Sequence, residues 1–265
     1  MTSPLLLRRL AIIPTLKCTL RCKLCSNYMT MYDDPPHVPV EEVIRDIDKI
    51  FALIDHTEWL QFVGGELFLR RDMGEVYMHC LRHRKKFDKL VLIINATVLP
   101  DEKDIEALNC YGQHCQVQIS DYGEHSRKLA EIVEIFKAND IPFVAKRYYG
   151  EGQHCGGWVD NNHFEERGKS EEELRRQFEN CGQIAMQNFH MFRGKLHGCA
   201  RSLMATTLGK IVPAPRDFLD LYDDSQSDEE KRETIRHFND SPRVSCRSCI
   251  SFGDDVPRFP AAEQL

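Results

Sequence analysis

Three cysteines near the start of the chain have the residue type and spacing of metal ligands. Cys18, Cys22 and Cys25 lie within eight residues, so one loop can bring three thiolates to a single metal centre. Structural zinc sites usually close around four ligands, whereas three ligands on one loop suit an iron–sulfur cluster. A [4Fe–4S] cluster held by three thiolates keeps one iron open, and an open iron can bind and activate a ligand. The spacing therefore predicts a catalytic centre.

Four further cysteines form a second group near the other end of the chain. They are Cys181, Cys199, Cys246 and Cys249, whereas Cys80, Cys110, Cys115 and Cys155 stand alone. The sequence shows neither a signal peptide nor an apolar stretch of membrane-spanning length, which predicts a cytoplasmic protein without a membrane partner. Because disulfides are rare in that reducing compartment, the grouped cysteines are better explained as metal ligands.

The composition indicates a folded protein of substantial size. The chain has 265 residues, of which 42% are hydrophobic and 29% charged. That is enough for one large core, or for a large and a small domain. The formal net charge is −6, whereas a nucleic-acid-binding surface favours excess positive charge. We therefore expect no nucleic-acid partner.

Strands and helices are expected to alternate through the first half of the chain. Short apolar runs predict strands, and apolar residues at helical spacing predict helices. The expected strands are 10–14, 59–63, 89–94, 117–119 and 141–146, and the expected helices are 39–54, 74–86, 101–109 and 129–136. Such an alternation implies a parallel sheet, so the expected fold class is α/β.

Polar segments follow each expected strand and would meet at one edge of the sheet. The first cysteine group follows the first strand and Gly64-Gly65-Glu66 follows the second, while Asn95, Ser120, Asp121 and Arg147 follow the others. In α/β barrels this edge carries the active site. Ordinary turn roles stay open for Asn95, Ser120 and Asp121, and a surface ion pair for Arg147.

The alternation ends near residue 150. Residues 150–170 are irregular and rich in glycine and polar residues, and they contain Cys155. We interpret this stretch as a cover over the active site or as a mobile linker. Beyond it we expect a helix over 171–178, a hairpin that turns at 193–195, and a helix over 227–238 that begins with a capping box.

Two motifs together resemble the radical S-adenosylmethionine (radical SAM) enzymes. Cys18-x3-Cys22-x2-Cys25 follows the first strand, with Leu24 before the last cysteine, and Gly64-Gly65-Glu66 follows the second, where that family has its methionine-binding element. The resemblance implies a partial (β/α)6 TIM-type barrel over residues 1–175. It also implies that the first cysteine group binds a [4Fe–4S] cluster whose open iron binds S-adenosyl-L-methionine.

The same resemblance implies roles for the residues around this cofactor. Glu66 would accept hydrogen bonds from the methionine ammonium group, and Gly64-Gly65 would let the backbone approach the ligand closely. Ser120 or Asp121 would bind the ribose hydroxyls, and Asn95 would meet the adenosyl group.

The C-terminal third resembles the twitch form of the SPASM auxiliary-cluster domain, a small α+β domain that would occupy residues 176–265. Cys181, a hairpin that delivers Cys199, a helix, and Cys246-x2-Cys249 follow its pattern. Four thiolates would ligate a second [4Fe–4S] cluster. The resemblance thus implies two clusters, S-adenosylmethionine, and an electron donor of the flavodoxin or ferredoxin type.

An auxiliary cluster favours oxidation of the substrate. In this family a 5′-deoxyadenosyl radical abstracts hydrogen from a C–H bond, and a nearby cluster can accept the remaining electron. Twitch-containing dehydrogenases such as 2-deoxy-scyllo-inosamine dehydrogenase work in this way. Only 17 residues precede Cys18, so we expect no leader-binding domain and a small-molecule substrate: a sugar, aminocyclitol or sugar nucleotide. Arg147 would bind this substrate or the cofactor carboxylate.

Two alternatives stay open. In an epimerase of a carbohydrate or peptide, Cys155 would return a hydrogen atom to the opposite face of the substrate radical. A zinc-binding structural protein would use the same grouped cysteines. The zinc interpretation leaves Gly64-Gly65-Glu66 without an explanation.

Overall fold

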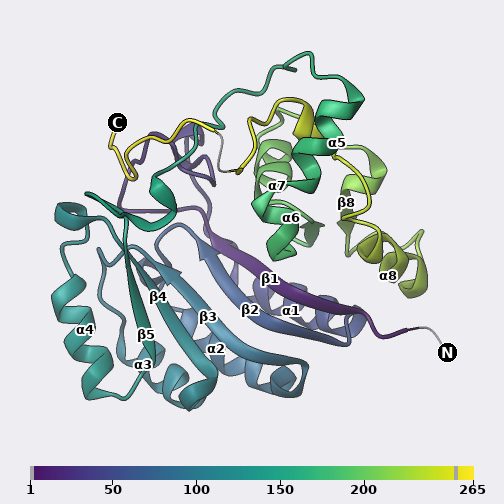
Figure 1. The fold of residues 1–265 in the computed structure, drawn as a ribbon. Coiled ribbons are helices and arrows are strands. Elements are labelled where there is room, and N and C mark those ends of the chain that lie inside the picture. The colour runs from purple at the N-terminus through teal and green to yellow at the C-terminus, as the bar shows by residue number, and fades with distance from the viewer. Residues whose placement is uncertain (1–2, 254–255) are drawn as a thin grey trace.

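The computed structural model describes residues 3–253 and 256–265, and a single eight-stranded sheet forms its centre (Figure 1). The strands lie in the order β5-β4-β3-β2-β1-β6-β7-β8. The pairs from β5 to β6 are parallel, and the β6–β7 and β7–β8 pairs are antiparallel. The strands are β1 (Leu6–Thr15), β2 (His56–Gly64), β3 (Phe87–Ile94), β4 (Cys115–Asp121), β5 (Phe143–Arg147), β6 (Asn188–Phe192), β7 (Lys195–His197) and β8 (Phe218–Asp220).

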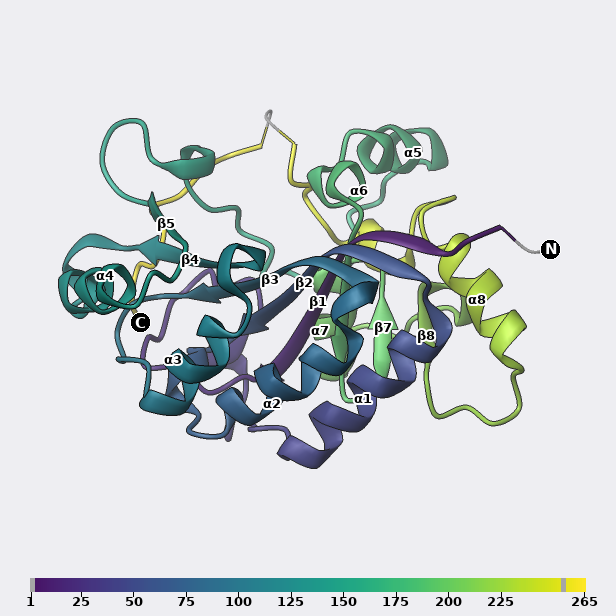
Figure 2. The same ribbon diagram turned by 90° about the horizontal axis from the view of Figure 1, so that it is seen from below.

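Helices connect the parallel strands, and Figure 2 shows α1, α2 and α3 side by side on one face of the sheet. The helices are α1 (Val40–Leu53), α2 (Met73–Cys80), α3 (Glu102–Asn109), α4 (Leu129–Ala138), α5 (Glu171–Glu179), α6 (Gly182–Met186), α7 (Ala200–Thr207) and α8 (Asp228–Arg236). Each strand and helix expected from the sequence is present. The fold is therefore α/β with a partial barrel, as predicted.

Three differences from the expected elements have local causes. The helix expected over 74–86 is α-helical only to Cys80 and continues as a 3-10 helix over Leu81–Lys86. Strand β5 begins at Phe143 rather than Ile141, because Pro142 has no N–H to donate to the sheet. The short elements α6, α7 and β8 were not expected, because segments of three to eight residues carry little periodicity.

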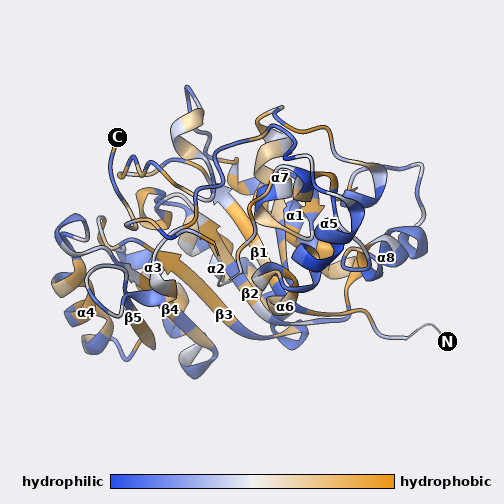
Figure 3. Ribbon diagram, turned by 45° about the horizontal axis from the view of Figure 1, so that its top comes forward, coloured by the Kyte–Doolittle hydropathy of each residue, from blue (hydrophilic) through white to orange (hydrophobic). Residues whose placement is uncertain are grey.

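Alternation along the strands separates an apolar face from a polar one. Phe62 on β2 and Val117 on β4 are fully buried, and Phe62 packs edge-on against Tyr77 of α2 with ring centroids 5.4 Å apart. Successive strand residues point to opposite faces, so Gln61 and Gln118 face the inside of the partial barrel. Figure 3 shows the hydrophobic residues concentrated in the strands and the polar ones on the outer helices.

Strand β1 lies near the centre of the sheet, between a strand from the first half of the sequence and a strand from the second half. It pairs with β2 over residues 6–15 and with β6 through Arg9–Asn188, Leu10–Phe189, Ala11–His190 and Ile12–Met191. The sheet thus continues across the predicted domain boundary at residues 175 and 176. The division into a barrel and a twitch domain stays a prediction.

The hairpin between β6 and β7 turns through two residues in left-handed conformation. Arg193 has a φ of 49° and Gly194 a φ of 69°, the combination found in type I′ turns. The N–H of Gly194 donates to Asp46 Oδ2 at 2.8 Å, which ties the turn to α1. A Cβ at Gly194 would lie 2.4 Å from the Tyr222 ring, so the position also requires glycine for packing.

Within the described residues, none of the helices combines the length and the apolar character needed to cross a membrane.

Candidate metal centres and cofactor site

The first cysteine group occupies the loop that leaves the carboxyl end of β1. Backbone hydrogen bonds from Cys25 N to Cys22 O (3.3 Å) and from Tyr28 N to Cys25 O (2.9 Å) fold this loop. The pKa of the Cys18 thiol is raised to about 12, mainly by burial and also by the nearby Glu66, Cys25 and Cys22, although the hydrogen bond from Leu20 N lowers it. The three thiols therefore share one low-dielectric environment, where thiolates need a metal cation to be stable.

Side-chain amides and the backbone direct N–H groups at these sulfurs. Cys18 Sγ accepts from Asn95 Nδ2 at 3.3 Å and from Leu20 N at 3.5 Å. Cys22 Sγ accepts from Gln264 Nε2 at 3.3 Å. Hydrogen bonds to cluster sulfurs are among the means by which a protein sets a cluster's potential. Three thiols with N–H donors around them fit a loop that carries a metal cluster.

Gly64-Gly65 lies where β2 ends against the start of the cysteine loop. A Cβ at Gly65 would lie 1.8 Å from Lys17 O, and one at Gly64 would lie 2.3 Å from Thr15 O. The N–H of Gly65 donates to Thr15 O at 2.9 Å. In the structure these glycines thus allow two backbones to touch, and their expected contact with methionine stays a prediction.

Glu66 is fully buried beneath the same strand ends. Its two carboxylate oxygens accept from Phe68 N (3.3 Å) and Asn95 N (2.8 Å), which connects the end of β2 to that of β3. Burial raises the pKa of Glu66 to about 7, although both hydrogen bonds lower it. An ammonium group brought beside it would favour the charged form.

The structure explains Asn95 and Asp121 first as turn residues. Asn95 Oδ1 accepts from the N–H of Thr97 at 3.0 Å, while its amide nitrogen donates to Cys18. Asp121 Oδ1 accepts from Gly123 N at 2.9 Å. Asp121 Oδ2 also accepts from Tyr149 Oη at 3.4 Å, and Asn95 also contacts the first cysteine group. Their predicted cofactor-binding roles stay predictions.

Ser120 lies at the end of β4 among aromatic side chains that connect to the first cysteine group. The ring centroid of Tyr122 lies 5.4 Å from that of Tyr148 and 5.7 Å from that of Trp158. Burial raises the pKa of Tyr122 well above its usual value, and a hydrogen bond with Ser120 opposes this. Tyr122 and Trp158 also pack against the buried cluster that contains Leu20 and Cys22 of the cysteine loop. Ser120 thus contacts Tyr122, which packs against the cysteine loop, and its predicted ribose-binding role stays a prediction.

Arg147 is the last residue of β5, and Cys155 lies in the region that follows this strand; both are exposed. Arg147 donates to Glu151 O at 2.5 Å and lies over the Tyr149 ring, so its contacts here are local. Cys155 is exposed, and its backbone adopts the left-handed conformation with a φ of 60°. It lies close enough to Lys146 and Tyr148 to influence the pKa of both.

The second cysteine group lines one cavity of about 20 Å³. All four predicted ligands contribute to its wall: Cys181, Cys199, Cys246 and Cys249. The pKa of Cys246 is raised to about 12 and that of Cys249 to about 11, mainly by burial and to a smaller extent by the neighbouring cysteines. Residues separated by up to 68 positions thus converge on one enclosed point, as ligands of one centre must.

Two buried arginines line the same cavity. Arg201 and Arg243 are 2% and 3% exposed, and each leaves its Nε–H without a hydrogen-bond partner. Arg201 lowers the pKa of Cys249, and Arg243 lowers that of Cys246. Buried charges are normally paired, so these guanidinium groups fit an anionic centre in the cavity, as a tetrathiolate cluster is.

The spacing of the sulfurs bears on the zinc alternative. Only Asp48, His79 and His83, among the residues that the structure describes, place three candidate ligand atoms within 4.8 Å of one another. In neither cysteine group do three sulfurs stand that close. Thiolates around one zinc ion at about 2.3 Å are roughly 3.8 Å apart. Both groups are therefore spread more widely in this structure than the ligands of a zinc tetrahedron.

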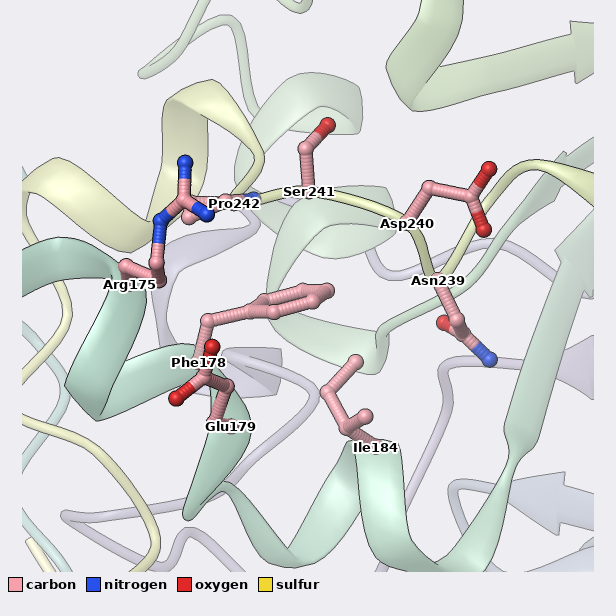
Figure 4. Close-up of a pocket in the computed structure, with 8 residues that line it drawn as sticks. All are labelled: Arg175, Phe178, Glu179, Ile184, Asn239, Asp240, Ser241 and Pro242. Carbon is pink, nitrogen blue, oxygen red and sulfur yellow. The ribbon is translucent and has the colours of Figure 1, made fainter.

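A larger cavity of about 330 Å³ opens beside the second cysteine group (Figure 4). Phe178 and Ile184 form part of both cavities. Apart from Pro242, the rest of its lining is polar or charged and includes Arg175, Glu179 and Asp240. None of the predicted site residues lines it.

Sequence reasoning missed Arg201, Arg243 and Gln264. Arg201 follows Cys199 by two positions and Arg243 precedes Cys246 by three, so proximity to a ligand in sequence was the available signal. Gln264 carries no such signal, because its partner Cys22 lies at the other end of the chain.

The sequence of residues 12–142 matches the radical SAM superfamily. The fold resembles BtrN in complex with AdoMet and 2-DOIA, with a TM-score of 0.55 and 11% identity over 100% of this chain and 99% of that chain. It also resembles hexahistidine-tagged anSMEcpe with bound AdoMet, with a TM-score of 0.52 and 15% identity over 98% and 93% of the two chains. No curated protein sequence matches this chain.

At these identities the structural likeness establishes the fold alone. It covers the C-terminal third as well as the matched region, since all of this chain aligns with BtrN. Residues 12–142 therefore form a radical SAM domain. The resemblance drawn from the cysteine spacing and Gly64-Gly65-Glu66 is confirmed.

Proposed function

We propose that this protein is a radical SAM dehydrogenase that oxidises a C–H bond of a small molecule and passes the released electron to an auxiliary [4Fe–4S] cluster. The observation that carries the proposal is the cavity in which four cysteines meet two buried arginines without Nε partners. An epimerase that returns a hydrogen atom needs no electron acceptor of this kind.

The first cysteine group would hold the radical-generating cluster. When bound there, the cluster and S-adenosylmethionine supply a 5′-deoxyadenosyl radical that removes hydrogen from the substrate. Glu66 would orient the methionine ammonium group, and Ser120 would bind the ribose. Tyr122 and Trp158 would exclude water, since both pack over the cysteine loop.

The charges around the second cysteine group support electron acceptance. A cluster with four thiolates becomes more negative on reduction, and a buried cation stabilises the more negative state more strongly. Arg201 and Arg243 line that cavity at 2% and 3% exposure, so solvent screens them little. They would raise the potential of the auxiliary cluster and make it an electron acceptor.

Oxidation of an alcohol to a ketone also releases a proton. Lys146 on β5 has a pKa lowered by burial, and Ser120 of β4 pairs with it across the sheet. Paired residues in neighbouring strands share a face, so Lys146 would lie on the same side of the sheet as the ribose-binding serine. We assign it the role of proton acceptor.

The substrate class in this proposal is a sugar, aminocyclitol or sugar nucleotide. The partial barrel presents Gln61 and Gln118 on its inner face, where both are more than nine-tenths buried. Side-chain amides can donate to and accept from hydroxyl groups. A flavodoxin- or ferredoxin-type protein would reduce the first cluster.

A carbohydrate or peptide epimerase is the second candidate, because Cys155 is exposed beside Tyr148. Anaerobic turnover of Cys155→Ala in deuterated water separates the two candidates. If the enzyme is a dehydrogenase, this variant should form its ketone undiminished, and the wild type under the same conditions should place no solvent deuterium on carbon. Loss of product with continued cofactor cleavage would establish the epimerase instead.

Iron and sulfide analysis after anaerobic reconstitution tests the cofactor content. We expect about eight irons per chain from two four-iron clusters. Cys181→Ala and Cys18→Ala should each remove about four of them. A protein that binds zinc and no sulfide would refute the proposed function.

A further inference from the structure

The last described residues, 256–265, run back along the first cysteine loop, and we call them the C-terminal strap. Trp158 and Phe259 exchange two backbone hydrogen bonds, each of 2.8 Å, and Cys22 pairs with Gln264 in an antiparallel bridge. Figure 1 shows this segment beside the loop that follows β1. The strap thus lies against the segment that carries the first three cysteines.

Backbone hydrogen bonds fix the strap on either side of Cys22. Lys23 N donates to Glu263 O at 2.7 Å, and Leu265 N donates to Arg21 O at 3.0 Å. An exposed ion pair between Lys23 and Glu263 adds little to this attachment. The register of the strap relative to the cysteine loop is therefore set by main-chain bonds.

The side-chain amide of Gln264 bridges the loop and a cysteine sulfur. Its Oε1 accepts from Arg21 N at 2.7 Å, and its Nε2 donates to Cys22 Sγ at 3.3 Å and to Ala262 O at 2.6 Å. A backbone N–H can only donate, and a carbonyl can only accept. The amide orientation is therefore determined by these two partners, and the group that faces the sulfur is the donor.

Ala262 closes the space between the strap and the cysteines. It is fully buried and packs against Leu20 and Cys22, with Tyr122 and Trp158 at the rim. Its φ of 56° is left-handed, a conformation that costs a non-glycine residue about 1–2 kcal/mol. The surrounding contacts must offset this cost, which indicates that the strap is a formed part of the site.

We propose that the C-terminal strap belongs to the first cluster site and that Gln264 is a positioning residue that raises the cluster's reduction potential. The inference rests on the proposed function, because it requires a cluster on Cys18, Cys22 and Cys25. An N–H donor stabilises a thiolate more strongly as the cluster gains an electron, so the donor favours the reduced state.

The test compares midpoint potentials of the anaerobically reconstituted full-length protein by redox titration with EPR detection. Gln264→Leu keeps the volume and removes the donor. Gln264→Glu keeps the acceptor for Arg21 N and places an anion near Cys22. The matched control is Glu263→Gln, which changes the neighbouring side chain and leaves the backbone bonds in place.

Both Gln264 variants should retain their iron and have a lower potential for the first cluster, with the larger fall in Gln264→Glu. For Gln264→Leu we expect about a tenfold shift in the reduction equilibrium, equivalent to about 59 mV for one electron. Glu263→Gln should leave the potential of the first cluster unchanged. None of the three variants should change the potential of the auxiliary cluster.

Two results would overturn the inference while leaving the proposed function intact. One is an unchanged potential in Gln264→Leu. The other is loss of the first cluster from both Gln264 variants but not from Glu263→Gln, which would show that the strap retains the cluster rather than tunes it. If the wild-type protein binds no cluster at Cys18, Cys22 and Cys25, the proposed function fails and the inference fails with it.

Discussion

Replacing Gly65 with alanine tests whether contact between β2 and the cysteine loop is what requires glycine. Gly65 does not have a positive φ, so its backbone conformation suits alanine. The obstacle is steric: the new Cβ would stand 1.8 Å from Lys17 O, whereas ordinary contact begins at 3.4 Å. Both groups belong to backbone, so no side-chain rotation can relieve the overlap.

The structure also sets the size of the effect. Separating the two backbones breaks the hydrogen bonds from Gly65 N to Thr15 O (2.9 Å) and from Glu66 N to Lys17 O (3.0 Å). Each such bond contributes about 1 kcal/mol, and overpacking costs about 1–3 kcal/mol more. We expect Gly65→Ala to lower the free energy of unfolding by about 3–5 kcal/mol, and the displaced loop to hold less iron.

The assay is urea denaturation followed by iron analysis, with Gly112→Ala as the control. Gly112 has a φ of 53°, and nothing lies within 4 Å of the point that a Cβ would occupy. Alanine there should therefore cost only about 1–2 kcal/mol of backbone strain. If Gly65→Ala were no less stable than Gly112→Ala and bound iron normally, the steric reasoning would be refuted.

Three further predictions concern charges. Arg243→Met should lower the potential of the auxiliary cluster in an EPR titration and leave that of the first cluster unchanged. If the auxiliary cluster had the same potential in the variant and the wild type, the charge argument would be contradicted. Lys146→Met should abolish ketone formation while 5′-deoxyadenosine still forms, and Lys146→Arg should not restore it; normal product from Lys146→Met would exclude the assigned base. Burial raises the pKa of Asp104 from 3.8 to about 7, so its contribution to stability is complete below pH 3.8 and is lost as the pH rises to 7. Asp104→Asn should therefore be more stable than the wild type at about pH 8 by roughly 1–3 kcal/mol, with no such gain at about pH 4. Urea denaturation of both proteins at both pH values checks this. Glu66 titrates in the same range, but it is present in both proteins, so its effect on the free energy of unfolding cancels in the difference.

Local patterns predicted most of the fold. Strands such as β3 combine a continuous apolar run with flanking polar turns, and α1 follows helical spacing from Val40 to Leu53. The grouping of Cys181 with Cys199, Cys246 and Cys249 was also predictable, because clustered cysteines that do not form disulfides are most often metal ligands. The cavity that all four line agrees with that grouping.

Contacts between distant parts of the chain could not be predicted in this way. Gln264 donates to Cys22 across 242 positions, and nothing near residue 264 indicates such a partner. Arg201 and Arg243 would ordinarily be assigned to the surface, since arginine is mostly exposed. Their burial depends on where α7 and the segment before Cys246 meet, which is a property of packing rather than of local sequence.

The position of β1 at the centre of the sheet has a consequence for synthesis in the cell. One edge of β1 can pair with β2 early, but the other waits for residues 188–191 to pair with residues 9–12. At about 5–20 residues per second, the ribosome needs roughly 9–36 s to make the intervening segment. During that interval the nascent chain presents an open parallel edge of β1, and strands of other molecules can add to such an edge. Demand for chaperones should therefore be greatest before β6 emerges, and a fragment that stops short of it should aggregate.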